Sequence, residues 1–287
     1  MSPGGVGGSD RSPRRRWSGD GTPIVTLTTD FGTRDSYVAA MRGVILGIAR
    51  EARLVDVSHE VAAHDVTEGA LALEAAAPFF PPGTVHLAVV DPGVGTDRRG
   101  LAVATDVALF VGPDNGLFTP FLEGREWRAF ELTAPEYRLR RVSRTFHGRD
   151  VFAPAAAHLA LGLPPERLGP PLDDPVRLHW PTVREAHGAV AGTVLHVDRF
   201  GNLVTSIREE AFESFGAVSV RIAGRGLPFV GTYGELMPGQ AGALVGGSGR
   251  LEIAVREGSA ATRLRARRGT PVVVSRSSAV RRVRRRP

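Results

Sequence analysis

The 287-residue chain contains no cysteine, which excludes disulfide bonds and thiolate chemistry. It also lacks lysine, since all 36 of its basic residues are arginine. Because glycine, proline and alanine are abundant as well, we interpret the arginine as the codon bias of a GC-rich genome and do not expect nucleic-acid binding. No apolar run approaches the ~18–20 residues that a membrane helix needs, so we expect no membrane segment.

The basic charge is concentrated at the two ends of the chain. Of the net charge of +6, residues 1–22 carry +2 and residues 276–287 carry +6, which leaves −2 for residues 23–275. Both ends have few apolar residues, and we predict disordered tails there. No apolar segment follows "RRRW" (14–17), so we expect no secretory signal and a cytoplasmic protein.

Strand-like and helical patterns alternate from residue 23 to residue 180, which predicts an α/β domain with a mostly parallel sheet between helices. The predicted strands lie at 24–29, 53–58, 84–90, 101–105 and 108–112, and the helices at 36–50, 65–77 and 150–162. The last two strands follow each other closely and predict a hairpin. We expect Asp65 and Asp150 to be helix N-caps.

A proline-rich connection at 163–183 separates this domain from a second one at 188–275. The second segment consists of short strands and turns, with no helical pattern longer than a few turns. It predicts a smaller β-barrel-like domain.

Carboxylates follow three of the predicted strands. Asp30 and Asp35 lie in "TTDFGTRD" (28–35), "DVSHE" (56–60) follows the second strand, and Asp91 follows the third. Aspartate is also a common turn residue and N-cap. Ligands of open α/β sheets bind beyond the carboxyl ends of the strands, so together these residues indicate a site at that edge.

His147 stands in "TFHGRD" (145–150), where Gly148 allows a ligand to approach closely. The two histidines of "HEVAAH" (59–64) are five residues apart, one too many for one helical face, and we expect no metal site. The chain has neither a dinucleotide-binding glycine fingerprint nor a Walker A sequence.

In the second domain, "VDRFGNLVTSI" (197–207) places Asp198 and Asn202 around an aromatic residue and a glycine. This arrangement suits an adenine or amino-acid site.

Six motifs occur in a fixed order: "TLTTDFGTRDSYV", "VDVSHEV…HDVTEGA", "GTVHLAVVDPGVGTDRRGLAV", "VGPDNGL", "TFHGRD" and "DRFGNLVTSI". With them the chain resembles the S-adenosyl-L-methionine (SAM) hydroxide adenosyltransferases, or SAM hydrolases, relatives of the SAM-dependent fluorinase and chlorinase. The resemblance covers about residues 23–275. It implies an N-terminal α/β domain, a C-terminal β-barrel-like domain, and homotrimers whose active sites lie between subunits.

The resemblance also implies that Asp91, Arg98 and His147 handle a water nucleophile. The halogenases lack the aspartate and the histidine, so the residues present here favour water over halide. Strand alternation points the neighbouring Arg99 away from Arg98, and we expect it to face solvent.

For the substrate, the resemblance implies that Asp30 binds the ribose hydroxyls and that Phe146 lies near the reacting carbon. It places Asp35, Asp198 and Ser248 near the methionine moiety, and Asn202 and Tyr233 near adenine. The halogenases carry an arginine directly after the serine at 248, where this chain has Gly249. Arg250 or a main-chain group is left to hold the methionine carboxylate.

The expected activity is hydrolysis of SAM to adenosine and L-methionine by an activated water or hydroxide at C5′. A sulfonium is already a good leaving group, so SAM is the substrate and no cofactor is expected. The alternatives are a SAM-dependent halogenase and a non-catalytic module that binds SAM or adenosine.

Overall fold

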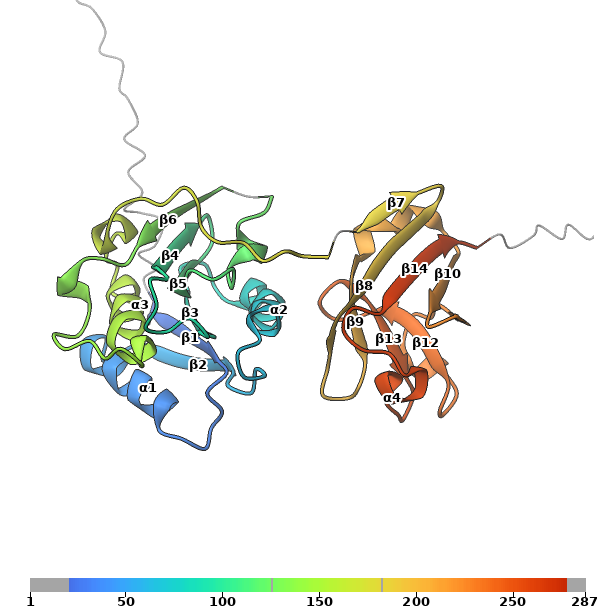
Figure 1. The fold of residues 1–287 in the computed structure, drawn as a ribbon, viewed down its shortest axis with the longest axis horizontal. Helices are drawn as coiled ribbons and strands as arrows, with labels where there is room; N and C mark the ends of the chain where they lie inside the picture. Colours follow the sequence, from blue (N-terminus) through green and yellow to red (C-terminus); the bar gives the residue numbers. More distant parts are fainter. Residues whose placement is uncertain (1–20, 125, 182, 278–287) are drawn as a thin grey trace, which may run out of the picture. The chain divides into compact units, whose positions relative to one another are not determined.

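The computed structural model of the protein describes residues 21–124, 126–181 and 183–277. The chain divides into two compact units, one ending at Leu178 and the other beginning at His179 (Figure 1). The tails predicted at 1–22 and 276–287 lie almost wholly outside the described residues. Within those residues, no helix has the length and apolar character needed to cross a membrane.

The N-terminal unit is built on a sheet that has six strands in the described residues, ordered β2-β1-β3-β5-β4-β6. The pairs β2–β1, β1–β3 and β3–β5 are parallel, whereas β4 pairs antiparallel with β5 and β6. The strands are β1 (Ile24–Thr29), β2 (Arg53–Ser58), β3 (Val85–Val89), β4 (Gly100–Thr105), β5 (Leu109–Pro113) and β6 (Trp127–Glu131). The predicted mostly parallel sheet and its β4–β5 hairpin are confirmed.

The first three strands create a topological switch point. The chain adds β2 on one side of β1 and β3 on the other, both parallel to it. Thr29, the last residue of β1, is in register with Val89, the last residue of β3. Ligands bind beyond the carboxyl ends of strands at such a point, so the residues that follow Thr29 and Val89 share the edge where a site is expected.

Helices cover both faces of this sheet (Figure 1). They are α1 (Tyr37–Ile48), α2 (Val66–Ala76) and α3 (Ala153–Ala160), with a π-helical turn, η5 (Gly148–Phe152), directly before α3. Met41 and Ile45 of α1 are buried in one apolar cluster with α3 and with Leu27 of β1. On the opposite face, Gly69 of α2 packs against Val90.

The N-terminus of α2 follows the prediction. Asp65 is its N-cap, and the carboxylate accepts a hydrogen bond from the Glu68 N–H at 3.0 Å. This bond satisfies one of the backbone donors that a first helical turn leaves without a partner.

Asp150 is not the N-cap that we expected. The π-helical turn begins at Gly148, so the helical backbone already includes Asp150, whose side chain is fully buried. Its carboxylate contacts Arg149 at 2.6 Å and accepts the Ser143 N–H at 2.7 Å. A buried carboxylate needs such partners, and Arg149 of the same turn and Ser143 before it supply them.

The C-terminal unit is an antiparallel, nearly closed sheet. In the described residues the strand order is β11-β10-β14-β8-β9-β13-β12, and β7 pairs with β8. A bridge between Phe229 and Ala243 brings the chain after β11 back to β12, as the predicted barrel-like form requires. Its elements are β7 (Arg184–Ala186), β8 (Ala189–Val197), β9 (Leu203–Arg208), β10 (Val218–Ile222), β11 (Arg225–Leu227), β12 (Ala241–Val245), β13 (Arg250–Val255), α4 (Ala260–Leu264) and β14 (Pro271–Arg276).

The ends of this unit differ from the predicted range of 188–275. β7 lies before that range and pairs with β8. Arg276, which composition placed in a tail, is the last residue of β14. Its N–H donates to the Gly188 carbonyl, and its guanidinium lies 5.1 Å from the centre of the Phe215 ring, so strand pairing and a cation–π contact order it.

The glycine at 112 in β5 is predicted to be required by packing. A Cβ there would lie 2.1 Å from the Ala88 carbonyl oxygen on β3. Gly112→Ala therefore lowers the free energy of unfolding by about 1–3 kcal/mol or more, as overpacked sites do.

The matched control is Gly43→Ala on α1, where a Cβ would meet nothing within 4 Å. Alanine is the better helix former, and this variant gains about 0.5–1 kcal/mol. Urea unfolding followed by circular dichroism measures both, and equal effects of the two variants contradict the packing argument.

Candidate active site

A tight turn joins β3 to β4 and brings Arg98 back over Asp91. The Val94 N–H donates to the Asp91 carbonyl, and the Thr96 hydroxyl donates to the Gly93 carbonyl at 2.7 Å. Gly95 has φ +80°, and a Cβ on it would lie 2.6 Å from the Arg144 carbonyl oxygen. The turn therefore lies against the segment that leads into His147, and glycine is needed at that contact.

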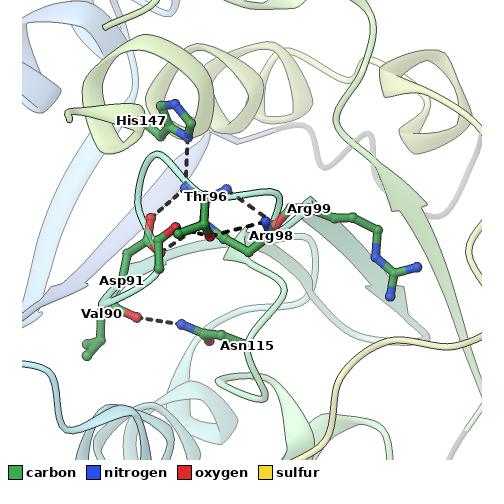
Figure 2. Close-up of polar contacts among 8 residues, drawn as sticks. Val90, Asp91, Thr96, Arg98, Arg99, Asn115 and His147 are labelled. Atoms are coloured by element: carbon green, nitrogen blue, oxygen red, sulfur yellow. Dashed lines mark hydrogen bonds and ion pairs between the residues drawn. The ribbon is translucent and has the colours of Figure 1, made fainter. Parts of the chain in front are cut away.

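Asp91 and Arg98 form a bidentate ion pair (Figure 2). Arg98 Nε donates to Asp91 Oδ1 at 2.9 Å, and Arg98 Nη2 donates to Asp91 Oδ2 at 2.5 Å. Only 5% of the Asp91 side chain and 11% of the Arg98 side chain are exposed. Two parallel charge-assisted hydrogen bonds fix the guanidinium plane as well as its position.

His147 completes the cluster from the segment before η5. Arg98 Nη2 lies 2.8 Å from His147 Nδ1 (Figure 2). A guanidinium can only donate, so Nδ1 accepts and the imidazole is the neutral tautomer with its proton on Nε2. Burial lowers the pKa of His147, the charge of Arg98 lowers it further, and the charges of Asp91 and Asp150 oppose them.

Neighbouring residues hold the cluster in place. The guanidinium of Arg98 lies 5.0 Å from the centre of the Phe152 ring, and its Nη1 donates to the Arg99 carbonyl. Asn115, in the "DNG" turn after β5, donates from Nδ2 to the Val90 carbonyl at 2.8 Å, directly before Asp91 (Figure 2). The sequence indicated only a turn there.

Arg99 points away from Asp91, as predicted (Figure 2), and it is partly exposed, but carboxylates pair with it there. Its Nε donates to Asp114 Oδ2 at 2.8 Å, and its Nη1 donates to Asp174 Oδ1 at 2.8 Å. These ion pairs raise the pKa of Arg99 against the effect of burial. Strand alternation gave the correct direction, but it could not reveal carboxylates that lie in that direction.

Three further candidates, Asp30, Asp35 and Phe146, belong to the N-terminal unit. Asp30 directly follows β1, and its Oδ2 accepts the His64 N–H at 2.8 Å. The Phe146 ring, half-buried, contacts the rings of Phe31 and Tyr37 edge-on. Asp35 is exposed just before α1.

In the C-terminal unit, Asp198 and Asn202 are joined within one turn. Asp198 Oδ1 accepts the N–H groups of Phe200 and Asn202 at 2.9 and 2.8 Å. Its Oδ2 accepts the Asn202 side-chain amide at 3.0 Å. The pair that the sequence singled out is therefore a closed turn, with the exposed Phe200 ring at its tip.

Tyr233 pairs with a residue that the sequence analysis missed. Its hydroxyl donates to Glu252 Oε1 at 2.5 Å. Burial raises the pKa of Glu252, as does the charge of Asp198, while the bond from Tyr233 lowers it. Burial and the neighbouring carboxylates raise the pKa of Tyr233. The available signal was a lone acid in the otherwise apolar core of "RLEIAV", all six residues of which are buried.

The two remaining candidates differ in burial. Ser248 is exposed in the turn between β12 and β13. Arg250 is buried, and its Nη1 donates to the Ser206 carbonyl at 3.4 Å. Among the described residues, no group of three or more histidines and carboxylates is arranged to hold a metal ion.

The cluster of Asp91, Arg98 and His147 combines a fixed cation, a carboxylate and a neutral imidazole at the carboxyl edge of the sheet. The guanidinium can stabilise a developing oxyanion, the carboxylate can accept a proton, and the imidazole can donate a hydrogen bond from Nε2. This combination suits the activation of a water molecule.

Comparisons with known proteins agree on one family. The families described as "SAM hydroxide adenosyltransferase N-terminal domain" and "C-terminal domain" match residues 25–169 and 192–273. A Thermus thermophilus protein named (R)-S-adenosyl-L-methionine hydrolase is 43% identical over 258 residues, 86% of this chain and 98% of its own. A fluorinase of Actinopolyspora mzabensis is 31% identical over 222 residues, 68% of this chain and 74% of its own.

A solved structure is similar in fold. The crystal structure of an uncharacterised conserved protein from Thermotoga maritima superposes with a TM-score of 0.82 at 35% identity, over 88% of this chain and 100% of that one.

The pKa of His147 is predicted to depend on Arg98. Arg98→Gln removes the positive charge beside Nδ1 and leaves the Asp91 carboxylate, so the pKa of His147 rises. Titration of the imidazole C–H signals by NMR measures the change. Arg99→Gln, adjacent in the chain but directed at Asp114, is the control and leaves the pKa nearly unchanged. A His147 pKa that stays fixed or falls in Arg98→Gln contradicts the assignment.

Proposed function

The chain belongs to the SAM hydroxide adenosyltransferase family, and on that basis we propose that it hydrolyses SAM to adenosine and L-methionine. The observation that carries the proposal is the contact of Asp91, Arg98 and His147 in one partly buried cluster. The name of the Thermus thermophilus relative, a hydrolase of (R)-S-adenosyl-L-methionine, supports the same substrate.

The reaction is an in-line displacement at C5′. A water oxygen forms a bond to C5′ as the C5′–S bond breaks. The electron pair of the C5′–S bond leaves with sulfur, which becomes the thioether of methionine. The water proton passes to the Asp91 carboxylate, while the guanidinium of Arg98 stabilises the hydroxide character that develops on oxygen. Holding the water in line with C5′ removes much of the entropic cost.

Water suits this cluster better than a halide ion does. The positive charge of Arg98 is already neutralised by the bidentate Asp91 carboxylate, so no net cation remains to offset the dehydration of an anion. A halide bound at this cluster would also be repelled by the negative charge of the Asp91 carboxylate. The same two groups bind a neutral water through its hydrogen atoms and its lone pairs.

We propose that the remaining candidate residues bind the parts of SAM that the family resemblance implies. Asp30 binds the ribose hydroxyls, and Phe146 lies beside C5′. The methionine moiety is contacted by Asp35, Asp198 and Ser248, and adenine by Asn202 and Tyr233. No cofactor or metal takes part in this mechanism, because the sulfonium needs no activation to leave.

The assembly is proposed to be a homotrimer acting in the cytoplasm. The candidate residues are divided between the two units, with Asp91 in the first and Asp198 in the second. The family resemblance implies that the N-terminal unit of one subunit completes this site with the C-terminal unit of the next.

The product assay tests the activity. The purified protein incubated with SAM is expected to yield adenosine and methionine by chromatography, with or without prior dialysis against a chelator. Asp91→Asn lowers kcat by about 10²–10⁴-fold, because it removes a base and the partner of Arg98. Asp97→Asn, on the exposed part of the same turn, keeps full activity.

Repeating the assay with fluoride and chloride separates the alternatives. Formation of 5′-halo-5′-deoxyadenosine in place of adenosine contradicts the hydrolase assignment. If the wild-type protein binds SAM but forms no product, the non-catalytic binding module is the alternative that remains.

The shared site is tested by mixing two defective variants. Asp91→Asn and Asp198→Ala, co-expressed with different tags, are each expected to be weak alone. If each site joins two subunits of a ring, random mixing leaves about one quarter of the sites intact. Activity that stays at the level of the single variants, or a fully active monomer by light scattering, contradicts the shared site.

A further inference from the structure

Three hydrogen-bonding contacts join the segment after β2 to the end of β1 and the residues that follow it, around Asp30. The Gly32 N–H donates to the His59 carbonyl at 2.7 Å, and the His64 N–H donates to Asp30 Oδ2 at 2.8 Å. The third contact joins the side chains of Thr29 and His59, whose Oγ1 and Nδ1 lie 2.8 Å apart. These contacts surround Asp30 in sequence and in space.

His59 is the buried part of this arrangement. Its side chain is 4% exposed and Thr29 is fully buried. His59 Nε2 lies 3.0 Å from Asp56 Oδ1, a polar contact that lacks the angle of a hydrogen bond. Asp56 in turn forms an ion pair with Arg42 of α1. A chain of contacts therefore connects helix α1 to the last residue of β1.

The direction of the Thr29 bond follows from its neighbours. Thr29 Oγ1 also accepts the Phe31 N–H at 3.3 Å, which leaves its hydroxyl hydrogen free to donate. The Asp56 carboxylate beside Nε2 favours the imidazole proton on that nitrogen, so Nδ1 accepts from Thr29. Burial raises the pKa of Asp56, but the contacts with Arg42 and His59 outweigh it and the net shift is downward.

We propose that His59 is a positioning residue for Asp30, acting through Thr29 to set the carboxylate against the ribose hydroxyls of the substrate. The proposal rests on the ribose role given to Asp30 above. With Oδ2 held by His64, the proposal assigns Oδ1 as the oxygen that accepts from the sugar hydroxyls. Losing the Thr29–His59 bond frees the backbone on both sides of Asp30, and the preference for a hydroxylated sugar falls.

The chain offers a close internal control. His86 Nδ1 lies 2.8 Å from Thr26 Oγ1, a second buried histidine–threonine bond in the same sheet. Thr26 lies in the middle of β1 and His86 in β3, away from Asp30 in the sequence. Loss of either bond reduces stability, but only loss of the Thr29–His59 bond is expected to change how a ribose is recognised.

The test measures sugar selectivity rather than hydrolysis. Calorimetry gives the affinities of adenosine and of 2′,3′-dideoxyadenosine for the full-length protein. A hydrogen bond to a charged carboxylate contributes enough to make adenosine bind about 10-fold more tightly, or more. His59→Leu is expected to reduce this ratio at least about threefold by weakening adenosine alone. His59→Asn, which keeps an acceptor near the place of Nδ1, recovers most of it, and His86→Leu leaves it unchanged.

Variants of the two threonines provide an independent test in case the histidine variants misfold. Thr29→Val removes the hydroxyl at nearly constant shape and lowers the ratio, whereas Thr29→Ser and Thr26→Val preserve it. A ratio that survives both His59→Leu and Thr29→Val, while Asp30→Ala abolishes it, overturns the positioning role.

A ratio that survives Asp30→Ala overturns the ribose assignment of Asp30 together with the role of His59. Because binding of adenosine needs no turnover, failure of SAM hydrolysis with intact sugar selectivity overturns the proposed activity alone.

Discussion

The buried ion pair between Asp91 and Arg98 is the constraint around which the candidate site is organised. Neither charge could be buried alone, since an unpaired buried ion costs several kcal/mol. The turn after β3 brings the two side chains together, and Asn115 fixes the backbone at Val90. The paired guanidinium then sets the tautomer of His147, so one interaction determines the state of all three groups.

We propose that the same pair also accounts for the choice of nucleophile. An arginine neutralised by a bidentate carboxylate provides directional donors without a net positive charge. Such a site binds a dipolar water well and an anion poorly, and the relation to fluorinases makes the distinction informative. We therefore propose that the Asp91 carboxylate, by neutralising Arg98, sets the preference for water over a halide ion.

Local patterns predicted the fold well, because strand and helix periodicity reflects burial within one element. The strands at 24–29 and 53–58 and the cap at Asp65 appear as expected. What the sequence could not supply was long-range pairing. Arg99 was assigned to solvent because Asp174, 75 residues away, lies in a loop with no pattern. Glu252 and the burial of Asp150 were missed for the same reason, since a charged residue gains a buried partner only when the chain has folded.

The central claim is that the cluster of Asp91, Arg98 and His147 directs a water oxygen onto C5′. Turnover of SAM in ¹⁸O-labelled water, with mass spectrometry of both products, tests it most directly. The account predicts one ¹⁸O atom in the 5′-hydroxyl of adenosine and none in methionine. Adenosine without the label, or label incorporated at any other carbon, would contradict it.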